Sequence, residues 1–498
     1  MKPAPAARYC PLCPSLTAPT PRRRTLVARA IALAVLCLSG CMVGPDYRRP
    51  AVETQSAYVG TVPQPTPAAV DSPVAALTRW WGLFDDPLLV SLVERAVQSN
   101  LDVKVAEARV RQARAAVQGA QSFLWPTLGS SGSAQRSRAP GFQGNRGNIS
   151  VLYQAGFDAS WELDIFGGVR RNIEAAEADL AAAGEARNDV LVTLTGEVAQ
   201  TYIDLRSFQQ RIAIARANLE TQNHSARITR QRFQAGFVSG LDVANAEAQA
   251  ATTAATIPLL ESAARQSIYR LSILLGLNPA DLLPELSPLG PIPLQPPAVP
   301  LGLPSELLQR RPDIRQAEAQ LHAATARIGV VTADLFPRFT IGGSAGLTSA
   351  SLGSLGWADR FWSIGPSVNW NVFDAGRTRA DIAQQQAIAE QTLFTYRQTV
   401  LTALQDVENA LIASAKEQEH RDELVRAVAG NRKALDLSMR LYTQGQTDFL
   451  SVLEAQRALT LTEDALASST GTVLTDLVAL YKALGGGWQE TGTPVAVD

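Results

Sequence analysis

The same pattern of hydrophobic and polar positions occurs twice along this chain of 498 residues. In each pass a helical pattern ends at a proline, two segments of alternating polarity follow, and a longer helical pattern begins. The first pass reaches Pro126 before the segment 148–164, and the second reaches Pro337 before the segment 361–373. A duplicated helix–hairpin–helix unit of this size favours a tubular assembly over an enzyme fold.

The longer helical patterns predict two very long helices. Residues 169–233 contain no proline, and apolar residues recur there every three or four positions, as on the buried face of a helix. This first stripe comprises Leu191, Leu194, Val198, Tyr202, Leu205, Ile212, Ala215 and Leu219. The second stripe, within residues 377–441, includes Val400, Leu404, Val407, Leu411, Leu424, Val428 and Leu435. At about 1.5 Å per residue, such a helix is roughly 100 Å long.

Glycines mark the turns at which the long helices end. Gly236-x4-Leu241 recurs as Gly445-x4-Leu450, 209 residues later. Shorter helices are predicted to run back after these turns, over residues 242–275 and from Gly445 to residue 484. Helices are also predicted over residues 80–121, where Asp85-Asp86-Pro87 marks the start, and over residues 305–334.

The alternating segments predict strands with one apolar and one polar face. In residues 148–164 the apolar positions are Ile149, Val151, Tyr153, Ala155, Phe157, Ala159, Trp161 and Leu163. In residues 361–373 they are Trp362, Ile364, Val368, Trp370 and Val372. Alternation of this kind with terminal aromatics is typical of a membrane barrel, with lipid outside and water inside. A half-buried soluble sheet alternates in the same way. The preceding strand of each pair is weaker, especially Thr127–Arg138.

Four strands in one chain cannot close a barrel. Open strand edges are excluded from lipid, because each unpaired backbone group there costs several kcal/mol. The chain must therefore oligomerise if its strands enter a membrane. Two copies give eight strands, whose interior is normally filled by side chains. Three copies give twelve strands, so the economical prediction is a trimer.

The N-terminus predicts export and lipidation. Arg22, Arg23 and Arg24 precede a short apolar run that ends at Leu38-Ser39-Gly40-Cys41. A basic region, a short apolar region and small residues before the cleavage point are typical of a bacterial secretory signal. Cysteine directly after Leu-Ser-Gly resembles a lipobox, which implies an N-acyl and diacylglycerol lipid on Cys41. An ordinary secretory signal with a chance cysteine is the alternative.

Charge and cysteine content argue against two classes of function, nucleic-acid binding and a cysteine-based redox or zinc site. Residues 1–40 carry six basic residues and no acidic ones, so their removal changes the formal net charge from -1 to -7. This acidic balance argues against nucleic acid as a partner. Cys10, Cys13 and Cys37 all precede Cys41, so the mature chain has no thiol beyond its anchor. One Cys-x-x-Cys pair in a leader does not make a redox or zinc site.

Four motifs resemble one family, the TolC-like outer-membrane efflux proteins. They are Cys41-Met42-Val43-Gly44-Pro45-Asp46-Tyr47-x-Arg49-Pro50, Trp81-x-x-Phe84-x-Asp86-Pro87, Leu308-Gln309-Arg310-Arg311-Pro312-Asp313-Ile314 and Leu484-Gly485-Gly486-Gly487-Trp488. The closest resemblance is to the lipoprotein branch that serves resistance–nodulation–division (RND) pumps. It implies a membrane α+β fold, in which a homotrimer forms a 12-stranded outer-membrane β-barrel continued by a long α-helical periplasmic tunnel. It also implies two partners, a periplasmic membrane-fusion adaptor and a proton-driven inner-membrane RND pump.

These patterns divide the chain into six segments. They are a lipoprotein signal peptide (1–40), a lipid-anchored Pro-rich segment (41–79), a first repeat with strands at about 127–164 (80–283), a Pro-rich linker (284–304), a second repeat with strands at about 338–373 (305–488) and a flexible tail (489–498).

The resemblance implies that the duct closes at its periplasmic tip. The inner constriction corresponds to Leu450, Glu454 and Arg457, with Tyr442 nearby on the preceding helix. Three-fold symmetry would turn each residue into a ring, and Glu–Arg pairs between chains would hold the tip shut. A solvated helix pair worth a few tenths of a kcal/mol is the alternative for Glu454 and Arg457.

The same tips are the expected surface for the adaptor. The residues are Gly236, Gly240, Leu241 and Asp242 in the first half, and Gly445, Asp448 and Phe449 in the second. Asp242 and Asp448 are also placed to cap the returning helices.

Three rival functions remain. Gly342-x-Ser344-x-Gly346 matches the nucleophile elbow of hydrolases, but that motif needs a strand–turn–helix and here lies in an alternating strand. The histidines, His224, His322 and His420, all fall in predicted helices, and we expect neither a catalytic nor a metal site. A trimeric stalk explains the long helices but not the strands, and a duct for type I protein secretion is the alternative within transport.

Overall fold

The computed structural model describes residues 42–52, 55, 57–59, 77–138, 149–293 and 304–488. The predicted signal peptide, Cys41 and the predicted C-terminal tail lie outside the described residues, as do most of the Pro-rich segment and half of the Pro-rich linker. The chain forms two compact units. The sheet unit comprises residues up to Pro45, Gln121–Asn172 and Ile328–Ile382, and the helical unit comprises Asp46–Ala120, Ile173–Arg327 and the residues from Ala383 onward.

The duplication predicted from the sequence is present in the structure, element by element. The first repeat contains η1 (Trp80–Phe84), α3 (Pro87–Ser99), α4 (Leu101–Ser122), β1 (Thr127–Arg138), β2 (Ile149–Leu163), α5 (Gly168–Gln234), α6 (Gly240–Leu274) and α7 (Leu283–Leu286). The second contains η2 (Pro304–Glu306), α8 (Leu307–Arg310), α9 (Pro312–Ala333), β3 (Arg338–Ser349), η3 (Leu352–Ser354), η4 (Trp357–Asp359), β4 (Arg360–Asn369), α10 (Arg377–Thr443) and α11 (Phe449–Ala483). The two long helices, α5 and α10, each have 67 residues, and their return helices, α6 and α11, each have 35.

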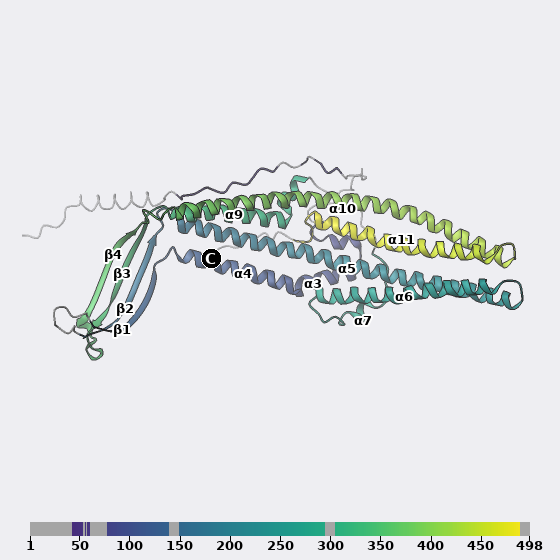
Figure 1. Ribbon diagram of the computed structural model, residues 1–498, viewed down its shortest axis with the longest axis horizontal. Coiled ribbons are helices and arrows are strands. Elements are labelled where there is room, and N and C mark those ends of the chain that lie inside the picture. The colour runs from purple at the N-terminus through teal and green to yellow at the C-terminus, as the bar shows by residue number, and fades with distance from the viewer. Residues whose placement is uncertain are drawn as a thin grey trace, which may run out of the picture. The chain divides into compact units, whose positions relative to one another are not determined.

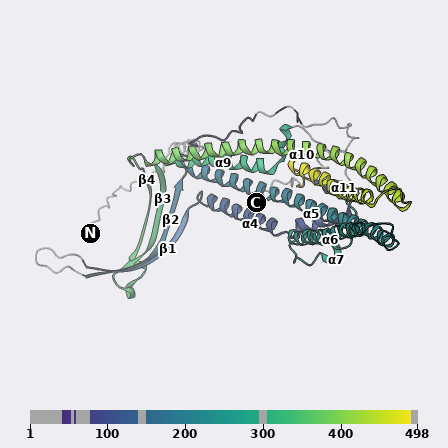
Figure 2. The same cartoon turned by 45° about the vertical axis from the view of Figure 1, so that its right-hand side comes forward.

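Two pairs of long helices dominate the helical unit. In Figure 1 and in the turned view of Figure 2, α5 doubles back into α6 and α10 doubles back into α11. The apolar stripes predicted on α5 and α10 lie mainly in the core, where Val198, Tyr202 and Val407 are at most 1% exposed. Among the described residues, no helix combines the length and apolar character needed to span a bilayer.

The four strands form one antiparallel sheet in the order β1-β2-β3-β4. The pairing of β2 with β3 joins the two repeats, and Tyr153 lies opposite Ser349 in that register. All three strand pairs keep an unbroken register, so alternate residues stay on one face along every strand. The predicted strands are confirmed, although β4 ends at Asn369 rather than at residue 373.

The helix start predicted at Asp85-Asp86-Pro87 is confirmed, because α3 begins at Pro87 and Asp86 caps it. The helices predicted over residues 80–121 and 305–334 are each divided in the structure. The first is interrupted at Asn100, which is not helical, between α3 and α4. The second is interrupted at Arg311, which is extended, between α8 and α9. A residue that precedes a proline disfavours the helical conformation, which accounts for the break before Pro312.

The C-terminal glycine motif and the end of α11 pack against residues just before Trp81 in the core of the helical unit. Trp80 is fully buried and stacks on Tyr481 of α11, with ring centroids 5.2 Å apart. Gly487 donates its backbone N–H to Leu77, and a Cβ on Gly486 would lie 2.8 Å from the Leu77 carbonyl oxygen. The C-terminal glycines therefore allow close approach to the backbone at Leu77.

Candidate gate, docking tips and channel-forming sheet

The first tip, between α5 and α6, is built from a glycine turn and a capping box. Gly236 has a φ of 75°, and the N–H of Phe237 bonds back to the carbonyl of Arg232 at 2.9 Å. Ser239 and Asp242 then cap each other's backbone N–H groups at 3.1 and 3.3 Å, so α6 starts with two satisfied donors. The predicted capping role of Asp242 is confirmed.

The second tip, between α10 and α11, repeats this geometry with a simpler cap. Gly445 has a φ of 76°, and the N–H of Gln446 bonds to the carbonyl of Leu441 at 2.9 Å. The Asp448 carboxylate accepts hydrogen bonds from the hydroxyl and the N–H of Ser451, at 2.8 and 3.1 Å. These bonds lower the pKa of Asp448. Its predicted capping role is confirmed.

Tyr442 joins the two tips within one chain. Its side chain is 2% exposed and packs edge-to-face on Phe449, with ring centroids 5.5 Å apart. Its hydroxyl lies 3.3 Å from the hydroxyl of Thr229, and the Arg232 guanidinium lies 4.6 Å from its ring centroid and donates to its carbonyl. Phe449 is also only 2% exposed, so in this conformation it supports the tip from inside and offers no docking surface.

The three predicted constriction residues lie along α11 but do not bind one another. Leu450 is 52% exposed, and Glu454 and Arg457 are also exposed. The Arg457 guanidinium donates to the Gln249 side chain of α6 at 2.8 Å. Within the part of the chain that the structure describes, Glu454 has no hydrogen-bond or ion-pair partner. The spacing of Glu454 and Arg457 therefore does not produce an intrachain ion pair.

Most of the predicted docking residues are exposed. Gly236, Gly240 and Gly445 are exposed, and Leu241 is 68% exposed. Sequence reasoning missed Phe237, which is 75% exposed directly after the Gly236 turn. The available signal was a large apolar residue placed in a helix break, where no core face is expected.

Sequence reasoning also missed a polar seam between α5 and α11. Gln456 donates to Ser225 at 2.8 Å, and Gln222 donates to Thr460 at 3.3 Å. Further along, Arg211 makes a two-pronged ion pair with Asp464 at 2.7 and 2.9 Å. The signal was a row of polar residues at helical spacing beside the apolar stripe. The seam ties the first long helix to the second return helix by polar contacts.

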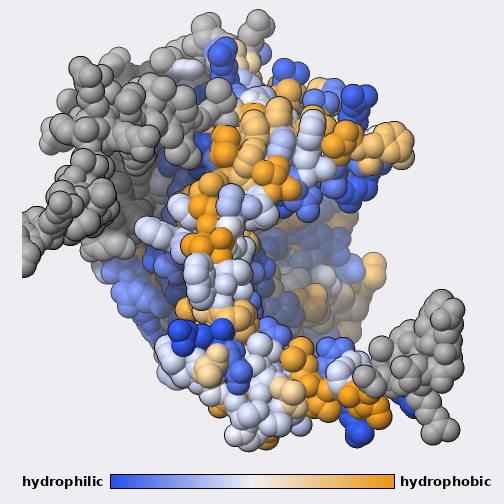
Figure 3. Space-filling view, turned by 90° about the vertical axis from the view of Figure 1, so that its left-hand side faces the viewer, coloured by the Kyte–Doolittle hydropathy of each residue, from blue (hydrophilic) through white to orange (hydrophobic). Residues whose placement is uncertain are grey.

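The sheet has one apolar and one polar face along β2, β3 and β4, and the separation is weak along β1. The unbroken register places Leu128, Phe157, Trp161, Ile341, Leu347, Trp362 and Ile364 on one face. The opposite face carries Ser131, Ser137, Gln154, Asp158, Thr340, Ser344, Ser363 and Ser367. Figure 3 shows patches of hydrophobic residues interleaved with polar ones. The alternation extends to β3, the first strand of the second pair. On β1 it does not, because the residues opposite the apolar face of β2 include Ser130, Arg136 and Arg138.

Short side chains hydrogen-bond across the polar face. Ser344 and Ser363 have their hydroxyls 2.8 Å apart, as do Thr340 and Ser367, and Ser131 donates to Asp158 at 3.2 Å. Ser344 is the central residue of the Gly-x-Ser-x-Gly motif, and it lies inside β3. The strand–turn–helix of a nucleophile elbow is therefore not formed at this motif.

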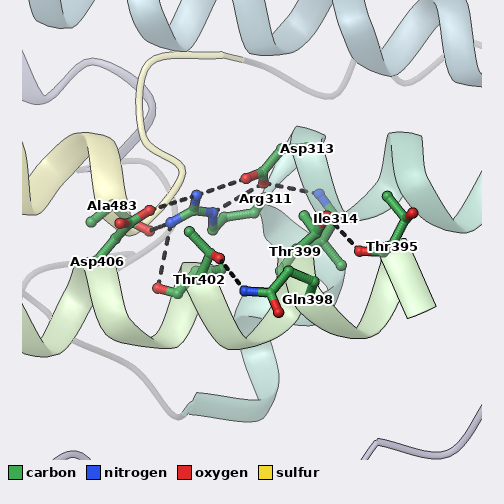
Figure 4. Close-up of polar contacts among 10 residues, drawn as sticks. Arg311, Asp313, Ile314, Thr395, Gln398, Thr399, Thr402, Asp406 and Ala483 are labelled. Carbon is green, nitrogen blue, oxygen red and sulfur yellow. Dashed lines mark hydrogen bonds and ion pairs between the residues drawn. The ribbon is translucent and has the colours of Figure 1, made fainter. Parts of the chain in front are cut away.

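Arg311 is the centre of an ionic cluster in the helical unit. Its guanidinium donates to Asp313 at 2.7 and 3.0 Å, to Asp406 of α10 at 3.1 Å, and to the carbonyl of Ala483 at 3.1 Å (Figure 4). A cavity of about 480 Å³ lies beside it and is also lined by Asp189, Asp476 and Lys482. Burial raises the pKa of Asp189 and of Asp476. One side chain thus joins α9, α10 and the end of α11.

Comparisons with known proteins agree with this geometry. The model of the family described as "Outer membrane efflux protein" matches residues 92–277 and 303–486, one match in each repeat. Nodulation protein T of Rhizobium leguminosarum bv. trifolii is 33% identical over 455 residues, covering 91% of this chain and 96% of that protein. The pyoverdine export outer membrane protein OpmQ of Pseudomonas aeruginosa is 36% identical over 452 residues, covering 85% and 94%.

Solved structures show the same fold. The outer-membrane channel OprN has a TM-score of 0.82 and 39% sequence identity, covering 90% of this chain and all of that chain. The open state of the Neisseria gonorrhoeae MtrE outer membrane channel has a TM-score of 0.75 and 29% identity, covering 91% and all of that chain.

Proposed function

The chain belongs to the outer membrane efflux protein family and is an outer-membrane efflux channel; on this premise we propose that it is the passive exit duct of a three-part RND efflux system. The observation that carries the proposal is the two-faced sheet, in which an apolar face suits lipid and a polar face suits a water-filled lumen. The duct performs no catalytic step in this proposal, and it needs no cofactor beyond its covalent lipid.

The working unit in this proposal is a homotrimer. In the four-stranded sheet, β1 and β4 each have one partner strand, which leaves an open edge on either side. Lipid excludes such edges, so β4 of one copy must pair with β1 of the next. Twelve strands are the smallest multiple of four that leaves a useful lumen.

The closure in this proposal is a set of side-chain rings at the periplasmic tip. Leu450, Glu454 and Arg457 project from α11, and three copies would present each of them three times. Glu454 has no partner among the described residues of its own chain, which supports a partner from a neighbouring copy. Arg457 would have to exchange its bond with Gln249 for one with Glu454 of that copy.

The partners in this proposal are a periplasmic adaptor and a proton-driven inner-membrane pump. The exposed turn residues Gly236, Leu241 and Gly445, together with the capping residues Asp242 and Asp448, form the adaptor surface. Relatives are named for the export of pyoverdine and for the efflux of toluene and other solvents. We therefore assign drugs or other small toxic compounds as the cargo. Cys41, which lies outside the described residues, carries the lipid that holds the N-terminus in the outer membrane.

Single-channel conductance in a planar bilayer tests the duct and its gate together. We expect the purified, lipidated protein to show small or rare openings, because the rings close the tip. The double variant Glu454→Ala/Arg457→Ala should open more often and conduct more. The variant Glu419→Ala/Lys416→Ala is the matched control, because it removes an exposed acidic and an exposed basic side chain, 2.9 Å apart, from a different helix, α10.

Each other outcome has a definite meaning. A similar large conductance in the wild type and the gate variant would support the proposed duct and contradict the proposed gate. No conductance from correctly assembled oligomers would favour a structural stalk. A lumen that carries an unfolded polypeptide but supports no efflux of small compounds would favour type I protein secretion.

A further inference from the structure

The first described residues of the chain, Met42–Gly44, are bound at the base of the sheet unit. The Val43 N–H donates to the carbonyl of Phe166, just after β2, at 3.1 Å. The Arg171 guanidinium, at the start of α5, donates through Nε to the Val43 carbonyl at 3.1 Å and through Nη2 to the Gly44 carbonyl at 3.4 Å. Arg171 is only 2% exposed, so a buried cation is directed at the backbone of this segment.

Three glycines make room for the segment. Gly167 has a φ of 79°, and a Cβ there would lie 2.8 Å from Cγ of Met42. A Cβ on Gly329 of α9 would lie 2.8 Å from the Val43 carbonyl oxygen and 2.7 Å from Cγ of Arg171. Gly44 has a φ of 90°, and its Cβ would lie 2.4 Å from Cα of Gly329. A side chain at Gly167 or Gly329 would collide with the bound segment, and a side chain at Gly44 would collide with Gly329.

Both repeats contribute to this binding cradle, which we define as Phe166, Gly167, Arg171 and Gly329. The first three residues come from the end of the first hairpin and the start of α5, and Gly329 comes from α9 of the second repeat. Phe166 also stacks on Phe336, with ring centroids 4.5 Å apart, which joins the two repeats at the same place. The cradle is a built site for an extended peptide, with one buried charge and matched backbone contacts.

We propose that the cradle is a positioning site for the N-terminus of the mature chain, so that the acyl groups of Cys41 are held in place rather than on a free tether. The inference rests on the proposed lipidation of Cys41. Consecutive Cα atoms are about 3.8 Å apart, so a lipid on residue 41 leaves the chain directly beside the bound Met42. The anchor then fixes the junction between strands and helices at the membrane surface, instead of only retaining the protein near it.

Spin-label mobility in the lipidated protein, reconstituted in lipid nanodiscs, tests the cradle. Pro45→Cys places a label on an exposed residue beside the bound segment, and acylation of Cys41 leaves this as the only free thiol. We expect a slow-motion spectrum in the otherwise unchanged protein. Arg171→Gln removes the guanidinium that binds the segment, and Gly329→Ala fills the space that the segment occupies. Each should shorten the rotational correlation time of the label roughly tenfold, toward the faster motion of a free chain end.

A matched glycine variant separates loss of the cradle from general loosening of the sheet unit. Gly342→Ala lies in β3 with open space around its Cβ, so the label should stay slow. A mobile label in the Pro45→Cys protein without further substitutions contradicts the proposed positioning role of the cradle, whether or not the variants assemble. So does a label that stays slow in both Arg171→Gln and Gly329→Ala. Intact mass reports the lipid independently, because an unacylated Cys41 with a slow label would refute the proposed anchor and leave the cradle standing.

Discussion

At the residue scale, Asn100 and Arg311 perform one task in the two repeats with different chemistry. Asn100 accepts hydrogen bonds from the N–H groups at the start of α4 and donates to the carbonyl of Leu274 at 2.9 Å. Arg311 lies 211 residues later and donates to the carbonyl of Ala483, which corresponds to Leu274 at an offset of 209. Each residue interrupts a helix and ties the break to the end of the return helix of its own repeat.

Removing the Arg311 side chain should destabilise the helical unit. Arg311→Ala leaves Asp313 without its cation and the Ala483 carbonyl without its donor, and we expect a loss of about 2–4 kcal/mol. The neighbouring Arg310 pairs with Glu306 at 3.6 Å, and Arg310→Ala should cost about 0.5 kcal/mol or less. The two variants can be compared by denaturant unfolding followed by circular dichroism. Equal losses would contradict the special role of Arg311.

Asp189 should make stability depend on pH. Burial raises the pKa of its carboxyl, Asp313 raises it further, and Arg311 and Lys482 oppose the shift. Since the folded chain holds the proton more tightly, stability falls as pH rises from the unfolded value, about 3.9, through the raised folded value. Asp189→Asn removes this loss. We therefore expect the variant to have a higher Tm than wild type at pH 7 and a similar Tm at pH 3. A difference that does not change with pH would rule this out.

At the element scale, periodicity predicted the strands and long helices but not the helix breaks. Period two is set by neighbouring residues, so the alternation in β2 and β4 could be recognised locally. The break at Asn100 depends on the Leu274 carbonyl at the end of α6, which is far away in sequence. The break at Arg311 had a local signal in Pro312, which the helix prediction did not use. The buried position of Phe449 likewise depends on Tyr442 and a neighbouring helix. Exposure of Leu241 and Leu450 followed from their place beside a turn.

A lysine should destabilise the protein much more at one position of β4 than at the adjacent one. Ile364 lies on the apolar face and Ser363 on the polar face. We expect Ile364→Lys to cost about 2–4 kcal/mol if the residue faces the bilayer centre, because the ammonium would meet lipid. Ser363→Lys should cost far less, since its side chain faces water. The measurement is the yield of folded, heat-resistant oligomer in the outer membrane. A greater loss from Ser363→Lys would reverse the assignment of the faces.

At the scale of the whole molecule, the duplication gives both halves equivalent hydrogen bonds. Trp161 donates its indole N–H to the Leu124 carbonyl at 2.9 Å, and Trp370 donates to the Leu335 carbonyl at 3.0 Å. The pairing of β2 with β3 then fuses the halves into one sheet. The tips of the two helix pairs are connected by the hydrogen bond from Tyr442 to Thr229. Glu454 of the proposed gate has no such partner among the described residues of its own chain, and the sequence of a single copy could not reveal one.

The assembled state should contain three chains. Only β1 and β4 remain available for pairing, and a twelve-stranded closure satisfies both edges of every copy. Light scattering of the mature protein in detergent, corrected for bound detergent, should give a mass about three times that of one chain. A stable dimer would contradict the proposed lumen, because eight strands enclose a filled interior.

The register between β2 and β3 also sets an order of events during synthesis. Tyr153 pairs with Ser349, which lies 196 positions later in the sequence, and the intervening residues include α5 and α6. Contacts of such high sequence separation form slowly, because a long loop must close before they contribute. The first hairpin must therefore wait, with one edge of β2 unpaired, until most of the chain has been made and exported. An unpaired apolar strand edge invites aggregation, so this interval is when a periplasmic chaperone would be most needed.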